Sequence, residues 1–398
     1  MELLTKASYT DEASPRELEN LRVAYEAACE GMVLLKNDGA LPFRTKKIAL
    51  YGAGASIGDH MHPDGAMEMQ TYENIGYAYN YLEKIAPFCY GGEPIANLGL
   101  YCSKRKEVNE GISNILLQHQ IDFGIVSNNN FSDYDTVIIP EYSQLDSGAL
   151  EALRSFISNG GKLVTSGDSL VKDGKFSIDI GLEFIGCAEY DCDYIESNGK
   201  YSNVPNAPML CNYPGFRTRS VGAEVFADFI TPYFSRTYRS FCGHKNTPHN
   251  KDSQKYPAIA KFGNVVYISH PLALSYYKIG SLFHREYFIN ALELVYSGGA
   301  YKVEGLGSQG RVTMIRQADR SRYCMNMTYA LPVRRGEAEI IEDIMPVHNI
   351  KVTLKVEEDV KRVYFGVSGE EIKTERVGNE LSFLIPELNC HATVVIEY

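Results

Sequence analysis

The feature that most limits the fold of this chain is a change in its hydrophobic period close to residue 300. Between residues 95 and 166, short apolar runs alternate with amphipathic segments, whereas after Ser297-Gly298-Gly299 the apolar residues recur at every second position. Apolar strands that alternate with amphipathic helices are typical of a parallel sheet covered on both faces. A period of two is typical of half-buried antiparallel strands. The sequence therefore predicts an α/β domain followed by a β-rich domain.

The alternation also predicts where the elements of the α/β domain lie. We expect helices over residues 71–85, 108–119, 147–158 and 281–296, and strands over residues 95–101, 122–126, 136–140, 162–166 and 264–269. Residues 181–190 and 224–232 extend the domain. Because helices or crossovers separate the first four strands, these strands should run parallel. The predicted fold class is α/β, flavodoxin-like, with a mostly parallel sheet.

The alternating pattern after residue 300 predicts a β-sandwich of antiparallel strands. Six segments alternate inward and outward residues, namely 311–315, 322–328, 350–356, 361–365, 380–385 and 392–397. About a hundred residues are enough for a sandwich of this kind. Ahead of the α/β domain, the segment Ser14-Pro15-Arg16-Glu17 has the pattern of a helix start, and strands follow over residues 32–35 and 47–51.

Length, charge and cysteine usage narrow the class of protein. The 398 residues predict two or three domains, and a net charge of −11 repels phosphate backbones, so we expect no nucleic-acid partner. No stretch approaches the roughly 20 apolar residues of a membrane span. The polar start predicts a cytoplasmic location or the loss of a leader. The nine cysteines are scattered and never form C-x-x-C, which predicts free thiols. We also expect no bound metal and no cofactor.

Two motifs resemble cofactor or nucleophile sites and depart from them. Gly52, Gly54 and Gly58 follow a predicted strand, but the third glycine comes four residues after the second instead of three, which argues against dinucleotide binding. Gly167-Asp168-Ser169 follows the strand at residues 162–166, where a glutamine amidotransferase presents a cysteine nucleophile on a sharp turn. No cysteine is present there, so amidase chemistry has no thiolate to activate.

Two clusters contain residue types that bind metals or sugars. Cys242, His244 and His249 form one, and Asp59, His60 and His62 form the other. Each set is incomplete as a zinc site, which usually needs four ligands or three and a water. Glycoside hydrolysis needs two carboxyl groups that flank the scissile bond. No such pair is identifiable. A solvated strand face is expected for three further carboxylates, Glu339, Glu342 and Asp343.

Two regions resemble different glycoside hydrolases. Residues 21–55, which contain "EGMVLLKNDGALPF", resemble the start of the second domain of glycoside hydrolase family 3. Residues 56–398 resemble the glutamine-amidotransferase-like trimerisation domain and the β-sandwich of β-galactosidase-like and fucosidase-like hydrolases. The matching runs are "SIGDHMHPDG", "YFSRTYRSFCGHKNTP", "YISHPLALSYY" and "MTYALPVRRGEAEIIEDIMPVHNIKVTLKV".

The resemblance implies three segments and one leading function. The segments are an entry segment over 1–55, a trimerisation-like α/β domain over 56–300 and a β-sandwich over 301–398. In both families the catalytic barrel precedes the retained region, so the leading hypothesis is a non-catalytic structural and oligomerising portion of a glycoside hydrolase. The alternatives are an active glycoside hydrolase whose acid/base pair is not recognisable and, less favoured, an amidase-like hydrolase.

The same resemblance implies sugar-contacting residues and binding partners. Asp59, His60 and His62 would contact sugar hydroxyls at the rim of a barrel. The chain would associate with itself as a homo-oligomer, as a trimer in the related hydrolases, and would meet carbohydrate or a barrel-containing chain. Tyrosine-rich and arginine-bearing residues 233–241 suit such a contact, because these side chains combine a large area with polar tips.

Overall fold

The computed structural model describes residues 69–341 and 343–398, together with Pro15, Leu18 and Arg22. The chain divides into two compact units, residues 1–78 and 79–398. In the first unit Pro15, Leu18 and Arg22 are helical, and the second unit begins within helix α3 (Met69–Ile85). The predicted strands at residues 32–35 and 47–51 lie outside the described residues.

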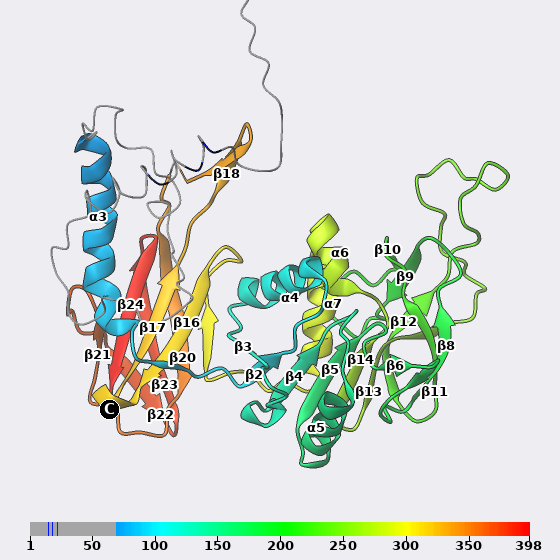
Figure 1. Cartoon of the computed structure of the whole chain (residues 1–398), viewed down its shortest axis with the longest axis horizontal. Coiled ribbons are helices and arrows are strands. Elements are labelled where there is room, and N and C mark those ends of the chain that lie inside the picture. Colours follow the sequence, from blue (N-terminus) through cyan, green and yellow to red (C-terminus); the bar gives the residue numbers. More distant parts are fainter. Residues whose placement is uncertain (1–14, 16–17, 19–21, 23–68, 342) are drawn as a thin grey trace, which may run out of the picture. The chain divides into compact units, whose positions relative to one another are not determined.

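A nine-stranded sheet forms the centre of the α/β part (Figure 1), in the order β10-β9-β12-β13-β14-β5-β4-β2-β3. Five neighbouring strands run parallel: β2 (Leu98–Leu100), β3 (Gly124–Ile125), β4 (Thr136–Ile139), β5 (Lys162–Ser166) and β14 (Val265–Ile268). The four strands predicted to be parallel are all in this group. That prediction is confirmed.

The other half of the sheet corrects the expectation of a mostly parallel sheet. The segment between β5 and β14 adds four antiparallel strands: β9 (Asp193–Glu196), β10 (Met209–Cys211), β12 (Glu224–Ile230) and β13 (Tyr256–Phe262). The sheet is therefore mixed. Two further pairs stand outside it, β6 (Val171–Lys172) with β7 (Lys175–Phe176) and β8 (Leu182–Cys187) with β11 (Phe216–Ser220).

Helices cover both faces of the sheet, and successive strand residues point alternately toward the two faces. One core combines the sheet with α4 (Lys106–Gln118), α6 (Leu272–Ile279) and α7 (Leu282–Glu293), and the other combines it with α5 (Ser147–Ser158). Along β4, Ile138 lies in the first core, and Val137 and Ile139 lie in the second. A sheet buried on both faces explains why its strands are continuous apolar runs.

Local sequence determines where α5 begins and ends. The Asp146 side chain accepts a 2.7 Å hydrogen bond from the Ala149 N–H, which caps the first turn of the helix. After the helix, Gly160 takes a φ of 93°, a conformation that favours glycine, and the chain then enters β5. The predicted bounds of this helix, residues 147–158, match the structure.

Two antiparallel sheets form the C-terminal part. One has the order β1-β16-β17-β24-β21 and the other β15-β20-β23-β22. Their strands are β1 (Glu93–Pro94), β15 (Tyr301–Glu304), β16 (Arg311–Gln317), β17 (Arg322–Thr328), β20 (Val347–Lys355), β21 (Arg362–Phe365), β22 (Thr374–Val377), β23 (Glu380–Leu388) and β24 (His391–Glu397). A hairpin of β18 (Val333–Arg335) and β19 (Ala338–Ile340) stands apart. Three single-turn helices complete the elements: η1 (Ala86–Phe88), η2 (Phe131–Asp133) and η3 (Ala318–Arg320).

One core joins the two C-terminal sheets. It contains Met325 and Val394 from the first sheet and Val352, Phe383 and Ile385 from the second. The six strands predicted from the period of two all occur here. Within the described part of the chain, no helix is long and apolar enough to cross a membrane.

Candidate functional site

Polar residues gather where the parallel strands of the large sheet end. Ser103, Glu141, Gly167 and His270 follow β2, β4, β5 and β14 within three residues of each strand end. Ligands of open α/β sheets bind outside this carboxyl edge. This carboxyl edge is therefore a candidate ligand-binding site.

The turn after β5 bends sharply at a glycine. Gly167 has a φ of 62°, in the left-handed region that favours glycine. A Cβ atom at this position would lie 2.9 Å from the Cβ of Glu141. Because this spacing is too short for two carbon atoms, the turn has no room for a nucleophilic side chain at its tip.

The two hydroxyls beside Gly167 are already engaged. Ser166 Oγ donates a 2.6 Å hydrogen bond to Glu141 Oε2, and Ser169 Oγ donates a 2.8 Å bond to the Ser166 carbonyl. Both serines are buried, and neither hydroxyl contacts an imidazole in the part of the chain that the structure describes. A serine nucleophile needs an adjacent base. Ser166 and Ser169 therefore lack the neighbouring base that acyl transfer needs.

Glu141 acts here as a structural bridge. Its side chain is fully buried, and Oε1 accepts a 2.9 Å hydrogen bond from the Leu274 N–H in the first turn of α6. Burial raises the pKa of this carboxyl, although the hydrogen bonds from Ser166 and Leu274 oppose the shift. Glu141 therefore ties β4 to β5 and to α6.

A pocket of about 470 Å³ opens beside this edge. The Arg105 guanidinium lies 3.9 Å from the centre of the Tyr142 ring, and Asp168 Oδ1 accepts a 3.0 Å hydrogen bond from the Tyr142 N–H. Among the described residues that line this pocket, Asp168 is the single carboxylate. Since glycoside hydrolysis uses two carboxyl groups, the pocket does not meet that requirement.

A larger cavity of about 760 Å³ lies between the amino edge of the parallel strands and the C-terminal sheets. Its lining includes four carboxylates, Asp122, Glu293, Glu304 and Glu380, and two tyrosines, Tyr296 and Tyr301. Burial raises the pKa of Asp122, and hydrogen bonds from the Met314 and Phe123 N–H groups oppose the shift. This cavity brings more than two acidic side chains to one place.

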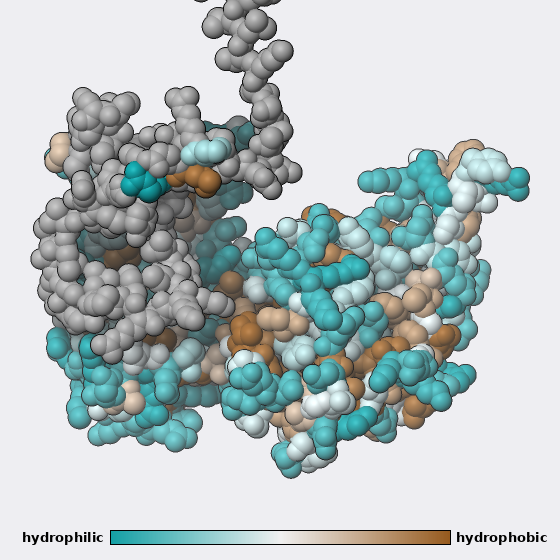
Figure 2. Space-filling model, viewed as in Figure 1, coloured by the Kyte–Doolittle hydropathy of each residue, from teal (hydrophilic) through white to brown (hydrophobic). Residues whose placement is uncertain are grey.

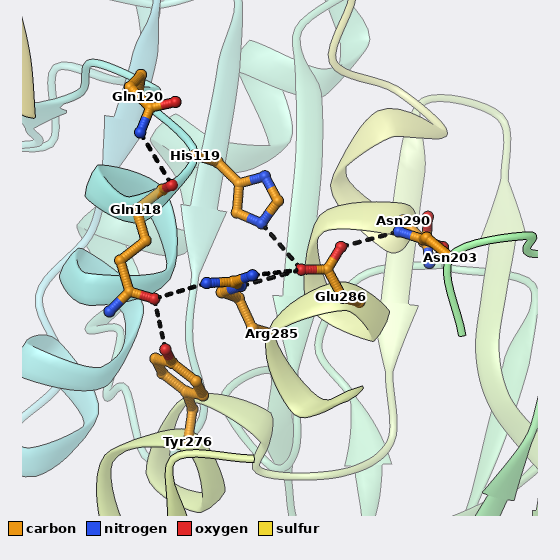
Figure 3. Close-up of polar contacts among 8 residues, drawn as sticks. All are labelled: Gln118, His119, Gln120, Asn203, Tyr276, Arg285, Glu286 and Asn290. Carbon is orange, nitrogen blue, oxygen red and sulfur yellow. Dashed lines mark hydrogen bonds and ion pairs between the residues drawn. The ribbon is translucent and has the colours of Figure 1, made fainter. Parts of the chain in front are cut away.

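A polar network borders this cavity and joins two helices (Figure 3). Arg285 donates to Glu286 Oε1 over 3.0 Å and to Gln118 Oε1 over 3.0 Å. His119 Nε2 lies 3.3 Å from Glu286 Oε1, and Asn203 donates a 2.9 Å hydrogen bond to Glu286 Oε2. Glu286 is largely buried, so these contacts compensate for the burial of its charge. The network holds the end of α4 against α7.

The network predicts a pH effect on stability. Burial lowers the pKa of His119, although the Glu286 carboxylate opposes the shift. Below the ordinary histidine pKa of about 6.5, the unfolded chain then binds more protons at this position than the folded chain, so stability falls as the pH falls. We expect His119→Gln to lose less stability than the wild type between about pH 7.5 and pH 5.5. Thermal melts across this range check the difference, and equal slopes for the two proteins would contradict it.

The described residues include only some of the candidates from the sequence. Asp59, His60 and His62 lie outside them. Cys242 Sγ donates to the His244 and Asn246 carbonyls, and the His249 ring packs against Tyr194 with 5.6 Å between the ring centres. Glu339 and Asp343 are exposed, whereas Glu342 is not described. In the described ranges, the one group with metal-ligand spacing is instead Asp193, Cys211 and His270, which no sequence motif marks.

Solved glycoside hydrolases share this architecture. The chain is 29% identical to α-L-fucosidase isoenzyme 2 from Paenibacillus thiaminolyticus, with a TM-score of 0.80 over 85% of this chain and 54% of that one. Gan42B, a GH42 β-galactosidase from G. stearothermophilus, matches with 13% identity and a TM-score of 0.55 over 85% and 45%. A β-galactosidase from Bacillus circulans sp. alkalophilus matches with 13% identity and a TM-score of 0.53 over 84% and 46%.

These matches confirm the predicted resemblance to fucosidase-like and β-galactosidase-like hydrolases. The match to the fucosidase combines sequence identity with a shared fold, whereas the matches to the β-galactosidases show the fold alone. The chain spans about half of the length of each of these proteins. No family model and no curated protein matches the chain.

Proposed function

We propose that this chain is a non-catalytic structural and oligomerising portion of a glycoside hydrolase. The observation that carries the proposal is the match to just over half of an α-L-fucosidase, which includes both the α/β part and the C-terminal sheets. The carboxyl edge supports it as well, because Gly167 leaves no room for a nucleophile and Ser166 is engaged by Glu141.

The proposal includes a flavodoxin-like fold for the α/β part and a division of the chain into domains. Counted along the chain, the parallel strands have the order 2-1-3-4-5, which is the order of flavodoxin-like sheets. This order supports a flavodoxin-like, glutamine-amidotransferase-like α/β domain over residues 56–300 and a β-sandwich domain over residues 301–398. Residues 1–55 remain the proposed family-3-like entry segment.

The proposed partners follow from the same relationship. A barrel-containing chain or a carbohydrate would meet this chain, with Asp59, His60 and His62 as the proposed sugar contacts. A cytoplasmic location and self-association as a trimer belong to the same proposal. Each of these points needs its own measurement.

The cavity of about 760 Å³ favours a second candidate function, an active glycoside hydrolase. Asp122 has a raised pKa, as a general acid requires, and Glu293, Glu304 and Glu380 line the same space. An acid with a raised pKa beside an ionised carboxylate is the arrangement that glycosidases use.

Activity of the purified chain separates the two functions. We expect no turnover of chromogenic fucosides, galactosides or glucosides, and no hydrolysis of glutamine, above the rate of a blank. Turnover that persists through a second purification and disappears in Asp122→Asn or Glu293→Gln would establish the second function and overturn the first. Loss in a matched variant outside the cavity, Asp168→Asn, would instead place the activity at the carboxyl edge.

The loop between β12 and β13 is the proposed contact for self-association. It extends from the α/β part (Figure 1), and Figure 2 shows both hydrophobic and hydrophilic residues on it. Tyr238 and Phe241 are 83% and 71% exposed there. Arg236 donates to the His244 and Lys245 carbonyls, which closes the loop on itself. Exposed aromatic side chains on a loop that is held in shape are typical of interfaces.

We expect the full chain to form an oligomer that this loop stabilises. Replacing Tyr238 and Phe241 together with alanine should weaken association about tenfold or more, since interface aromatics commonly contribute 2 kcal/mol or more. Light scattering after size exclusion at micromolar concentration measures the change. Tyr90→Ala, which alters a tyrosine that is 74% exposed elsewhere, is the control. A monodisperse wild-type monomer that binds no hydrophobic dye would contradict the expectation.

A further inference from the structure

Three side chains with metal-binding atoms converge in the buried interior of the α/β part. They are Asp193 at the start of β9, Cys211 at the end of β10 and His270 just after β14. Asp193 and Cys211 face each other directly across the antiparallel pair. One ligand atom from each of the three residues lies within 4.8 Å of the others, and all three residues are buried. The strand pairing and the β14 turn therefore create the cluster.

Neighbouring groups orient two of these side chains. Asp193 Oδ1 lies 2.7 Å from His270 Nε2, while Oδ2 accepts a 2.8 Å hydrogen bond from the Gly215 N–H. The other ring nitrogen, His270 Nδ1, lies 2.8 Å from Ser269 Oγ. A Cβ at Gly215 would lie 2.9 Å from the imidazole, so only glycine lets this backbone come so close. Metal ligands typically have their second polar atom fixed in this way.

A second buried histidine, in the neighbourhood of His270, has no hydrogen-bond partner among the described residues. His284 on α7 is fully buried, and neither ring nitrogen has a hydrogen-bond partner in the described part of the chain. An unpaired buried polar group is destabilising, so its presence needs an explanation. A bound ion would supply the missing partner.

A catalytic triad would be a different explanation for Ser269, His270 and Asp193. Ser269 and His270 are 0% exposed and Asp193 is 1% exposed, so no substrate reaches them. None of the three residues lines the larger cavity or the pocket at the carboxyl edge. A closed set of nitrogen, oxygen and sulfur ligands is instead typical of structural zinc.

We propose that Asp193, Cys211 and His270 bind a structural zinc ion, and that the His284 side chain turns toward the ion as its fourth ligand. The thiolate of Cys211 and the carboxylate of Asp193 balance the two positive charges of the ion. On binding, Cys211 releases its proton to solvent, and the His270 proton moves from Nε2 to Nδ1, where it is donated to Ser269 Oγ. The ion joins β9, β10, the end of β14 and α7. This inference departs from the expectation of no metal, which rested on the incomplete ligand sets around Cys242 and around Asp59.

Metal content and cobalt spectroscopy of the full chain test the site. We expect about one zinc per chain after expression with zinc and exhaustive dialysis, and about tenfold less in Cys211→Ala. Cys324→Ala, which removes a buried cysteine of the C-terminal sheets, should keep its zinc. Ser269→Ala should bind zinc about tenfold more weakly, because it loses only the group that orients His270.

The wild-type protein gives a readout that does not depend on whether the variants fold. Zinc-free wild type titrated with cobalt(II) should show the visible bands of a tetrahedral site and a sulfur-to-cobalt charge-transfer band, and the latter band should be absent in Cys211→Ala. Wild-type protein without stoichiometric zinc and without a charge-transfer band on cobalt addition would overturn the proposal. A band of equal intensity in Cys211→Ala would do so too. Neither result bears on the glycoside screen, so the two proposals fail separately.

Discussion

Replacing Glu141 with alanine should destabilise the α/β part by about 2–4 kcal/mol, from two lost hydrogen-bond partners and the space left by the side chain. The Ser166 hydroxyl and the Leu274 N–H both bond to this carboxylate, and neither has solvent to replace it, because Ser166 and Leu274 are buried. The first turn of α6 would also lose an acceptor near its positive dipole end.

Glu141→Gln and Glu151→Ala distinguish the causes of this loss. Glutamine keeps the shape and one acceptor oxygen, so it should cost clearly less than alanine. Glu151 is exposed on α5, and its truncation should change stability by less than about 0.5 kcal/mol. Because a chain with two cores need not unfold in one step, amide exchange in residues 136–166 and 265–279 is the appropriate measurement alongside thermal melts. Unchanged exchange in Glu141→Ala would show that the buried carboxylate is not a bridge.

The sequence predicted the elements that are bounded by turn residues or by a helix cap. It did not predict the contacts of Glu141, whose partners are distant in the chain. β4, β5 and α5 were located within about one residue, because turn residues bound their apolar runs and Asp146 caps the helix. The partners of Glu141 lie 25 and 133 residues away in the chain, at Ser166 and Leu274. No local pattern connects residues at such distances.

The elements that the sequence did not predict also depend on contacts between residues that lie far apart in the chain. α6 (Leu272–Ile279) has no clear amphipathic period, because its first four residues are all buried between the sheet and its neighbours. The antiparallel half of the sheet depends on pairings such as Asp193 with Cys211, whose side chains carry no mark of their shared position. For the candidate sites, the sequence predicted the missing nucleophile after β5 but not the cluster around His270, since its ligands come from separate strands.

Gly111→Ala should be strongly destabilising, although the same change normally favours a helix by up to about 1 kcal/mol. A Cβ at Gly111 on α4 would lie 2.1 Å from the Ala273 carbonyl oxygen and 3.3 Å from the Tyr277 Cβ on α6. The obstacle at Ala273 is backbone, which no side-chain rotation can relieve. Overpacking of this kind costs about 1–3 kcal/mol and more where backbone must move.

The matched change Gly76→Ala should have the opposite sign, because no described residue lies within 4 Å of a Cβ added at Gly76 on α3. Amide exchange in peptides that cover α4 and α3 compares the two variants within their own helices. Gly111→Ala should speed exchange in α4 and α6 and, since the first turn of α6 holds Glu141, also in the end of β4. Faster exchange in α4 alone would mean that α6 keeps its hydrogen bond to Glu141 when the helices separate. Slower exchange in α4 would show that the two helices do not approach each other this closely, and the bridge from Glu141 to α6 would then lose its support from the packing of α4.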